Sequence, residues 1–107
     1  MDNIRIIIAN EPRAYREAIA AVFAQLRPHA EVLLVEPDEL DGCLARLAPQ
    51  LVLYSRASAA VEGGAAGWVL LHPDGAARVE VAVAGRRESL GGIELDGLLA
   101  LVDRAAA

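Results

Sequence analysis

The sequence of 107 residues predicts one α/β domain over residues 1–107, a small three-layer fold of about five strands with three helices. Three observations predict this class. Short, continuous apolar runs alternate with amphipathic helical stretches through the first half of the chain. The connections between them are short, as in a parallel sheet whose crossovers are helices. The second half places a turn between two further strands, which predicts a C-terminal antiparallel hairpin at the edge of the sheet.

Residues 4–35 supply the first two strands and the helix between them. Residues 4–9 are almost continuously apolar and β-branched, as in a strand covered on both faces. Asn10 to Pro12 end this strand, and proline suits the first position of a helix. The helix is predicted by one apolar stripe at helical spacing, made of Tyr15, Ile19, Val22, Phe23 and Leu26. Residues 32–35 form a second apolar strand.

The same alternation continues to residue 54. Glu36-Pro37-Asp38 opens a second helix, whose apolar stripe consists of Leu40, Cys43, Leu44 and Leu47. Pro49 ends this helix, and residues 51–54 form a third buried strand. The order β-α-β-α-β with short connections requires a parallel sheet with right-handed crossovers.

The second half of the chain breaks this alternation. Residues 55–67 are small and rich in glycine without a helical stripe, which predicts a loop or at most one helical turn. Residues 68–71 form a fourth strand, residues 72–75 have turn chemistry, and residues 78–83 alternate as in a half-buried strand. Residues 85–90 hold one further short strand. A closing helix is predicted by Ile93, Leu95, Leu98, Leu99 and Val102.

The composition excludes several function classes. A net charge of −5 argues against binding to nucleic acids or to anionic membranes. With 55% hydrophobic and 23% charged residues, the chain is not intrinsically disordered. No apolar run approaches the roughly 20 residues of a membrane span, and the acidic start is not a signal peptide. The single cysteine, Cys43, cannot form a disulfide within the chain, so we expect the protein in a reducing cytoplasm. We expect Cys43 itself to lie in the core.

Three segments of the first half carry a family resemblance: residues 4–11 (IRIIIANE), residues 16–19 (REAI) and residues 49–55 (PQLVLYS). Through them, residues 4–55 resemble the receiver domain of bacterial two-component response regulators. The resemblance implies a flavodoxin-like sheet with helices on both faces and a role in signal transduction.

In that family, two carboxylates after the first strand and an aspartate after the third strand hold Mg²⁺, and the aspartate accepts the phosphoryl group. A threonine or serine after the fourth strand and a lysine after the fifth contact that group. Here the matching positions carry Asn10, Glu11, Ser55 and His72, and the chain contains no lysine. The resemblance therefore implies a non-catalytic pseudo-receiver without metal or cofactor. We expect Arg56 to pair with Glu11 and to fill the space of the metal.

The predicted helices leave part of one face of the sheet uncovered. The helices with Tyr15 and Leu98 are expected on one face and the helix over residues 40–47 on the other. The third and fourth strands are apolar on both faces, so we expect an interaction face that a homodimer or a protein partner covers. Its residues are Leu51, Leu53, Val69 and Leu71. Alternatively, residues 57–67 fold back over that face as a lid.

Two other functions stay open. Open α/β sheets bind ligands at the carboxyl ends of their strands, and the residues expected there are Asn10, Glu11, Ser55 and Arg56. A hydrolase is the remote alternative, with Ser55, His72 and Asp74 as nucleophile, base and orienting acid. Against it, the chain has no G-x-S-x-G turn, and Asp74 lies two residues after His72 in a predicted turn.

Overall fold

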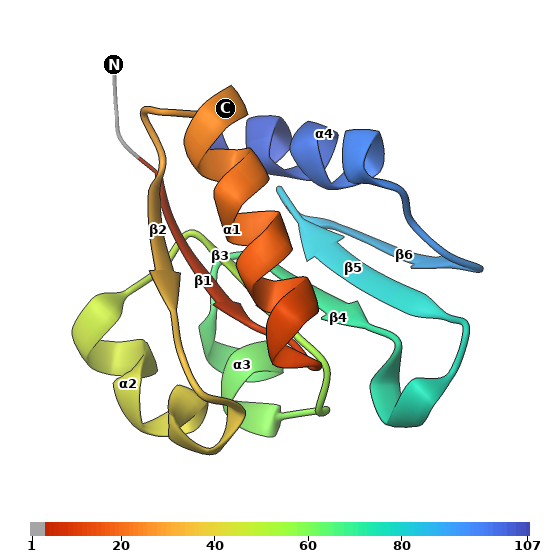
Figure 1. Ribbon diagram of the computed structural model, residues 1–107. Coiled ribbons are helices and arrows are strands. Elements are labelled where there is room, and N and C mark those ends of the chain that lie inside the picture. The colour runs from red at the N-terminus through yellow and green to blue at the C-terminus, as the bar shows by residue number, and fades with distance from the viewer. Residues whose placement is uncertain (1–3) are drawn as a thin grey trace.

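A computed structural model describes residues 4–107 and shows a mixed sheet with helices on both faces (Figure 1). The six strands of this part of the chain run in the order β2-β1-β3-β4-β5-β6. They are β1 (Arg5–Ala9), β2 (Glu31–Leu34), β3 (Leu51–Tyr54), β4 (Trp68–Leu71), β5 (Val79–Val83) and β6 (Arg86–Leu90). The helices are α1 (Arg13–Leu26), α2 (Leu40–Leu47), α3 (Ala59–Gly64) and α4 (Leu95–Ala106), with 3-10 turns at Pro37–Glu39 and Pro73–Gly75. The α/β class is confirmed; β6 is the further short strand predicted over residues 85–90, and α3 is one helix more than predicted.

The parallel half of the sheet consists of β2, β1, β3 and β4. Ile7 at its centre lies opposite Leu33 in β2 and Val52 in β3. β3 and β4 are buried at every position, as their unbroken apolar sequences predict. β2 has the same kind of sequence but lies at the edge, where Leu34 is 49% exposed.

The antiparallel half consists of β4, β5 and β6, which confirms the predicted edge hairpin and pairs the predicted short strand of residues 85–90 with β5. Between β4 and β5 the chain turns through left-handed φ angles at His72 (48°), Asp74 (55°) and Gly75 (75°). β5 alternates as predicted, with its three valines buried on one face. Because the turns are short, neighbouring strands in this half are also neighbours in the sequence.

The first face of the sheet is covered by α1 and α4, as predicted. Phe23 of α1 and Leu98 of α4 are at most 2% exposed and belong to one apolar cluster with Ile6 and Ile8 of β1. The stripe of α1 points inward only in part, because Leu26 at its end is 49% exposed. The larger of the two apolar clusters therefore lies on this face.

The second face is covered by α2 and by a helix that the sequence did not predict. Within residues 55–67, Ala59–Gly64 form α3, where the sequence predicted a loop or at most one helical turn. The hydroxyl of Ser58 caps this helix by accepting from the N–H of Val61 at 3.3 Å. The side chain of Val61 is fully buried among Val52 of β3, Leu70 of β4 and their neighbours. One anchor and one cap thus hold α3 over the middle of the sheet.

The prediction of an open interaction face on β3 and β4 was wrong. Leu51, Leu53, Val69 and Leu71 are each at most 1% exposed. All four side chains point to the first face of the sheet, where α1 and α4 cover them. The opposite faces of β3 and β4 lie under α2 and α3, so the chain covers its own sheet, as in the lid alternative.

An ion pair joins the two helices of the first face. Nε and Nη2 of Arg27 donate to the two carboxylate oxygens of Asp103 at 2.7 and 2.8 Å. These hydrogen bonds lower the pKa of Asp103 below its ordinary value. Its contribution to stability is present above the unfolded-state pKa, about 3.9, and is lost as the pH falls through the lower folded-state pKa.

We therefore expect Asp103→Asn to lower the free energy of unfolding at pH 6 by up to about 1 kcal/mol, since the pair is solvent-exposed. Near pH 2 the variant and the original chain should have equal stability. Urea unfolding at the two pH values measures both differences. An equal penalty at both pH values would show that the carboxylate charge is not the cause.

Candidate functional site

The site residues predicted from the sequence meet at the carboxyl ends of three strands. Asn10 and Glu11 follow β1, Ser55 and Arg56 follow β3, and His72 follows β4. Parallel strands end at the same edge of a sheet, so these positions lie together. A hollow of about 580 Å³ is lined there by Glu11, Pro12, Tyr15, Ser55, Arg56, His72, Asp74 and Gly75. Asn10 itself is fully buried.

Arg56 binds two carboxylates from two other loops. Its Nε and Nη2 donate to the carboxylate of Glu11 at 3.0 and 3.2 Å, and its Nη1 donates to Asp38 at 2.6 Å. The hydrogen bonds to Glu11, and then to Asp38, raise the pKa of Arg56 above its ordinary value. We call this group the Arg56 clamp. The predicted pair with Glu11 is confirmed, and Asp38, in the turn after β2, is a second partner that sequence reasoning missed.

Ser55 and His72 are engaged separately. The Ser55 hydroxyl accepts from the backbone N–H of Glu11 at 2.8 Å, which joins the loops after β1 and β3. Nδ1 of His72 lies 3.1 Å from the carbonyl oxygen of Ala76, a geometry in which Nδ1 donates. Asp74 lies inside the turn Pro73–Gly75. Among residues 4–107 no hydrogen bond joins Ser55 to His72, so the nucleophile–base contact of a hydrolase is not formed.

Asn10 and Arg16 form the buried layer of the site. Neither polar atom of the Asn10 amide has a hydrogen-bond partner within residues 4–107. Arg16 of α1 is 4% exposed, and its guanidinium lies 3.5 Å from the Asn10 carbonyl oxygen and 3.2 Å from Glu36. Sequence reasoning did not identify Arg16 as a site residue. Its spacing to Ile19 and Phe23, three and seven residues on, is the signal that places it on the inner stripe of α1.

The acidic side chains of the Arg56 clamp pair with an arginine of the chain itself. In the described part of the chain, no three histidine, cysteine or acidic side chains form a group that could hold a metal ion. Glu11 in the loop after β1 and Asp38 in the turn after β2 both bind the guanidinium of Arg56. The guanidinium of Arg56 thus lies between these two carboxylates.

Two residues outside the Arg56 clamp, Cys43 and Trp68, have structural roles. Cys43 is buried, as predicted, with its Sγ 3.2 Å from the Leu40 carbonyl oxygen. Trp68 lies edge-on to Tyr54 in the core, and the guanidinium of Arg87 lies over its ring at 5.2 Å.

Residues 4–107 include no helix that is long and apolar enough to cross a membrane. Comparison of the chain with models of protein families, with curated proteins and with solved structures finds no match.

Proposed function

We propose that this chain is a non-catalytic, receiver-like regulatory domain that acts in the cytoplasm through protein–protein contact and is not phosphorylated on aspartate. The Arg56 clamp carries the proposal. In the receiver domains that residues 4–55 resemble, acidic side chains at these strand ends hold Mg²⁺. Here the guanidinium of Arg56 neutralises Glu11 and Asp38 instead.

The residues at the other positions support the same proposal. Ser55, at the position of the phosphoacceptor, has no carboxylate with which to form an acyl phosphate. Its hydroxyl already accepts from the N–H of Glu11. The clamp ties together the loops that follow β1, β2 and β3. A domain tied in this way presents one constant surface to its partner.

A magnesium titration with a phosphodonor tests the proposal. The isotope-labelled chain is mixed with Mg²⁺ and acetyl phosphate and followed by amide NMR spectra and intact mass. We expect no added phosphoryl group and no shift of the Glu11 and Asp38 signals. Arg56→Ala is the matched variant, because it frees both carboxylates, and Mg²⁺ should shift their signals. An alkali-labile phosphoryl group on the original chain would contradict the proposal.

The interaction half of the proposal has its own test. The tagged chain is expressed in its native host, captured, and quantified with its companions by mass spectrometry. We expect a companion in stoichiometric amount, or a second copy of the chain. A chain that is recovered alone and stays monomeric at high concentration would contradict a role in protein–protein contact.

A second function, the binding of a small ligand at the strand ends, is favoured by one observation. The Asn10 amide is fully buried without a hydrogen-bond partner among the described residues, and the adjacent residue Glu11 lines the hollow with Ser55 and His72. A buried unpaired amide costs about 1–3 kcal/mol, which a ligand that hydrogen-bonds to it would recover. Thermal shift measurements with a panel of metabolites test this function. A thermal shift that is lost in Asn10→Leu would support ligand binding. The absence of a shift with every compound would favour the regulatory function proposed first.

A further inference from the structure

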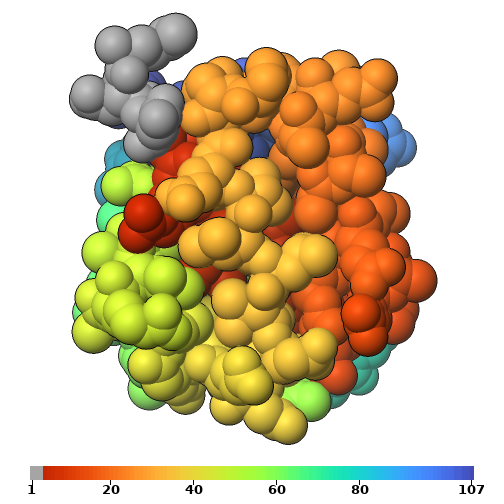
Figure 2. All heavy atoms as spheres, turned by 60° about the vertical axis from the view of Figure 1, so that its left-hand side comes forward, coloured from red at the N-terminus to blue at the C-terminus, as the bar shows by residue number. Residues whose placement is uncertain are grey.

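The two edges of the sheet differ in their capacity to bind another strand. The β6 edge carries Arg86, Arg87 and Glu88, and charged side chains oppose pairing between edges. The β2 edge is apolar between Glu31 and Glu36. Figure 2 shows this segment as a golden band on the surface, between α1 in orange and α2 in yellow-green.

The β2 edge also presents free backbone groups. The N–H groups of Glu31 and Val35 donate to the carbonyls of Ile4 and Ile8 at 2.8 and 3.1 Å. Because backbone groups alternate along a strand, the N–H and C=O groups of Leu34 point away from β1. No strand within residues 4–107 pairs with this edge. The edge is therefore open to a strand from outside this part of the chain.

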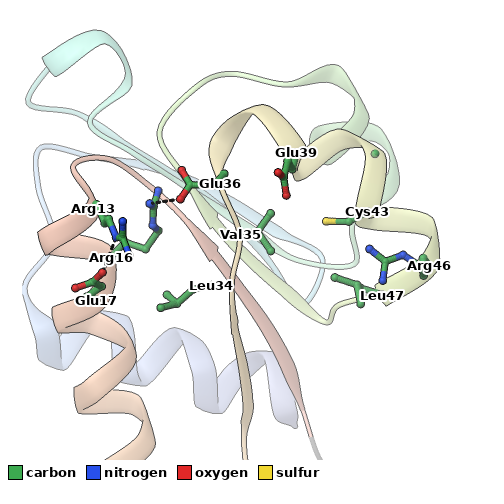
Figure 3. Close-up of a pocket in the computed structure, with 11 residues that line it drawn as sticks. Arg13, Arg16, Glu17, Leu34, Val35, Glu36, Glu39, Cys43, Arg46 and Leu47 are labelled. Carbon is green, nitrogen blue, oxygen red and sulfur yellow. Dashed lines mark hydrogen bonds and ion pairs between the residues drawn. The ribbon is translucent and has the colours of Figure 1, made fainter.

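A hollow of about 410 Å³ surrounds the end of β2, between α1 and α2 (Figure 3). Leu34 points toward α1, and Val35 points toward Cys43 of α2. Leu34 is 49% exposed, as much as any large apolar side chain that the structure describes. The strand edge is thus bordered by accessible apolar groups on both faces of the sheet, which is the arrangement that strand addition uses for affinity and side-chain contact.

The charges beside this hollow are self-complementary. Two side chains of opposite charge line it near the carboxyl end of β2: Glu39, which precedes α2, and Arg46 of α2. Within residues 4–107 neither residue forms an ion pair. A two-fold axis at Leu34 places this hollow of one copy next to the same hollow of the other. Each copy thus offers a carboxylate and a guanidinium to the other, the self-complementary charges that a two-fold interface uses.

We propose that the partner is a second copy of this chain, whose β2 pairs antiparallel with β2 across a two-fold axis at Leu34. Leu34 of each copy exchanges two hydrogen bonds with its counterpart, and Leu33 lies opposite the partner's Val35. The two sheets become one continuous sheet. This inference rests on the proposed function, since it names the partner and the surface of the protein–protein contact.

Sedimentation velocity from low-micromolar to near-millimolar concentration tests this inference on the full chain. We expect a monomer–dimer equilibrium that Leu34→Lys weakens by about tenfold or more, because a buried charge at the axis faces its own copy. Leu95→Lys is the matched control, since Leu95 is 39% exposed at the start of α4. It should dimerise like the original chain. Thermal unfolding confirms that both variants fold.

Charge reversal tests the orientation of the two copies. Glu39→Arg and Arg46→Glu should each weaken the dimer, and the double variant should restore it. A chain that stays monomeric, a dimer that tolerates Leu34→Lys, or a double variant without recovery would overturn the inference. A monomer that captures another protein in stoichiometric amount would leave the proposed function standing. Phosphoryl transfer to a dimeric chain would overturn the proposed function alone.

Discussion

Val61→Asp is expected to lower the free energy of unfolding by about 4 kcal/mol at pH 7. The Val61 side chain is fully buried between α3 and the sheet. Burial there raises the pKa of a carboxyl from about 4 to 7 or higher, and each unit between folded and unfolded states costs about 1.36 kcal/mol. Urea unfolding, followed through the fluorescence of the single tryptophan, Trp68, measures this loss.

The pH dependence separates charge from packing at this position. Because the folded-state pKa of the new carboxyl is the higher one, the penalty is full at pH 7 and disappears below the unfolded-state pKa of about 3.9. Val61→Ala is the control, with a loss of about 2 kcal/mol at either pH from lost burial and the cavity. A Val61→Asp variant as stable as the original chain at pH 7 would mean that α3 does not cover the sheet in solution.

Asn10→Leu is expected to raise the free energy of unfolding by about 1–3 kcal/mol. The amide of Asn10 is fully buried, and neither of its polar atoms has a partner in the described chain. Replacing an unpaired polar group with an apolar side chain of similar volume removes its desolvation cost. The midpoint of urea unfolding should increase without a change in the slope.

Ser55→Ala is the control for this prediction, because the Ser55 hydroxyl has a partner. It accepts from the N–H of Glu11 at 2.8 Å, so its loss should lower the free energy of unfolding by about 0.5–1.5 kcal/mol. Opposite signs for the two neighbouring substitutions would identify Asn10 as a position kept polar at the expense of stability. A clear loss of stability in Asn10→Leu would instead show that water pairs with the buried amide.

The parallel half of the fold could be predicted because its strands are almost continuously apolar. Residues 51–54 and 68–71 have no polar side chain that favours exposure on either face, which fits only strands covered on both sides. The same property concealed which face each residue points to. Leu51 and Val69 were expected on an open face, although both point to the face under α1 and α4, because an unbroken apolar run carries no period of two.

α3 could not be predicted from its residues alone. Its sequence AAVEGG ends in two glycines and has one large apolar side chain, so intrinsic preference for helix is weak. The helix forms because Ser58 caps it and Val61 packs into the sheet. Such tertiary contacts override local preference, and a short segment gives no periodic signal of them.

The candidate site was predicted in part. The pair between Arg56 and Glu11 could be expected, since the ends of adjacent parallel strands converge. Asp38 and Arg16 were missed for different reasons. Asp38 reaches the clamp through a loop whose path the sequence does not specify. Arg16 interrupts an otherwise apolar inner stripe, where a buried arginine is uncommon.

The mixed sheet has a consequence for the order of folding. β4, β5 and β6 are joined by short turns, and Val83 pairs with Arg86 directly across the last of them. β1 pairs with β2 and β3 only after long crossovers have closed. Loop closure delays such distant pairings. We therefore expect the β4–β6 meander to form first and to serve as the template for the parallel strands. Folding would then begin in the half of the chain that lies outside the receiver resemblance.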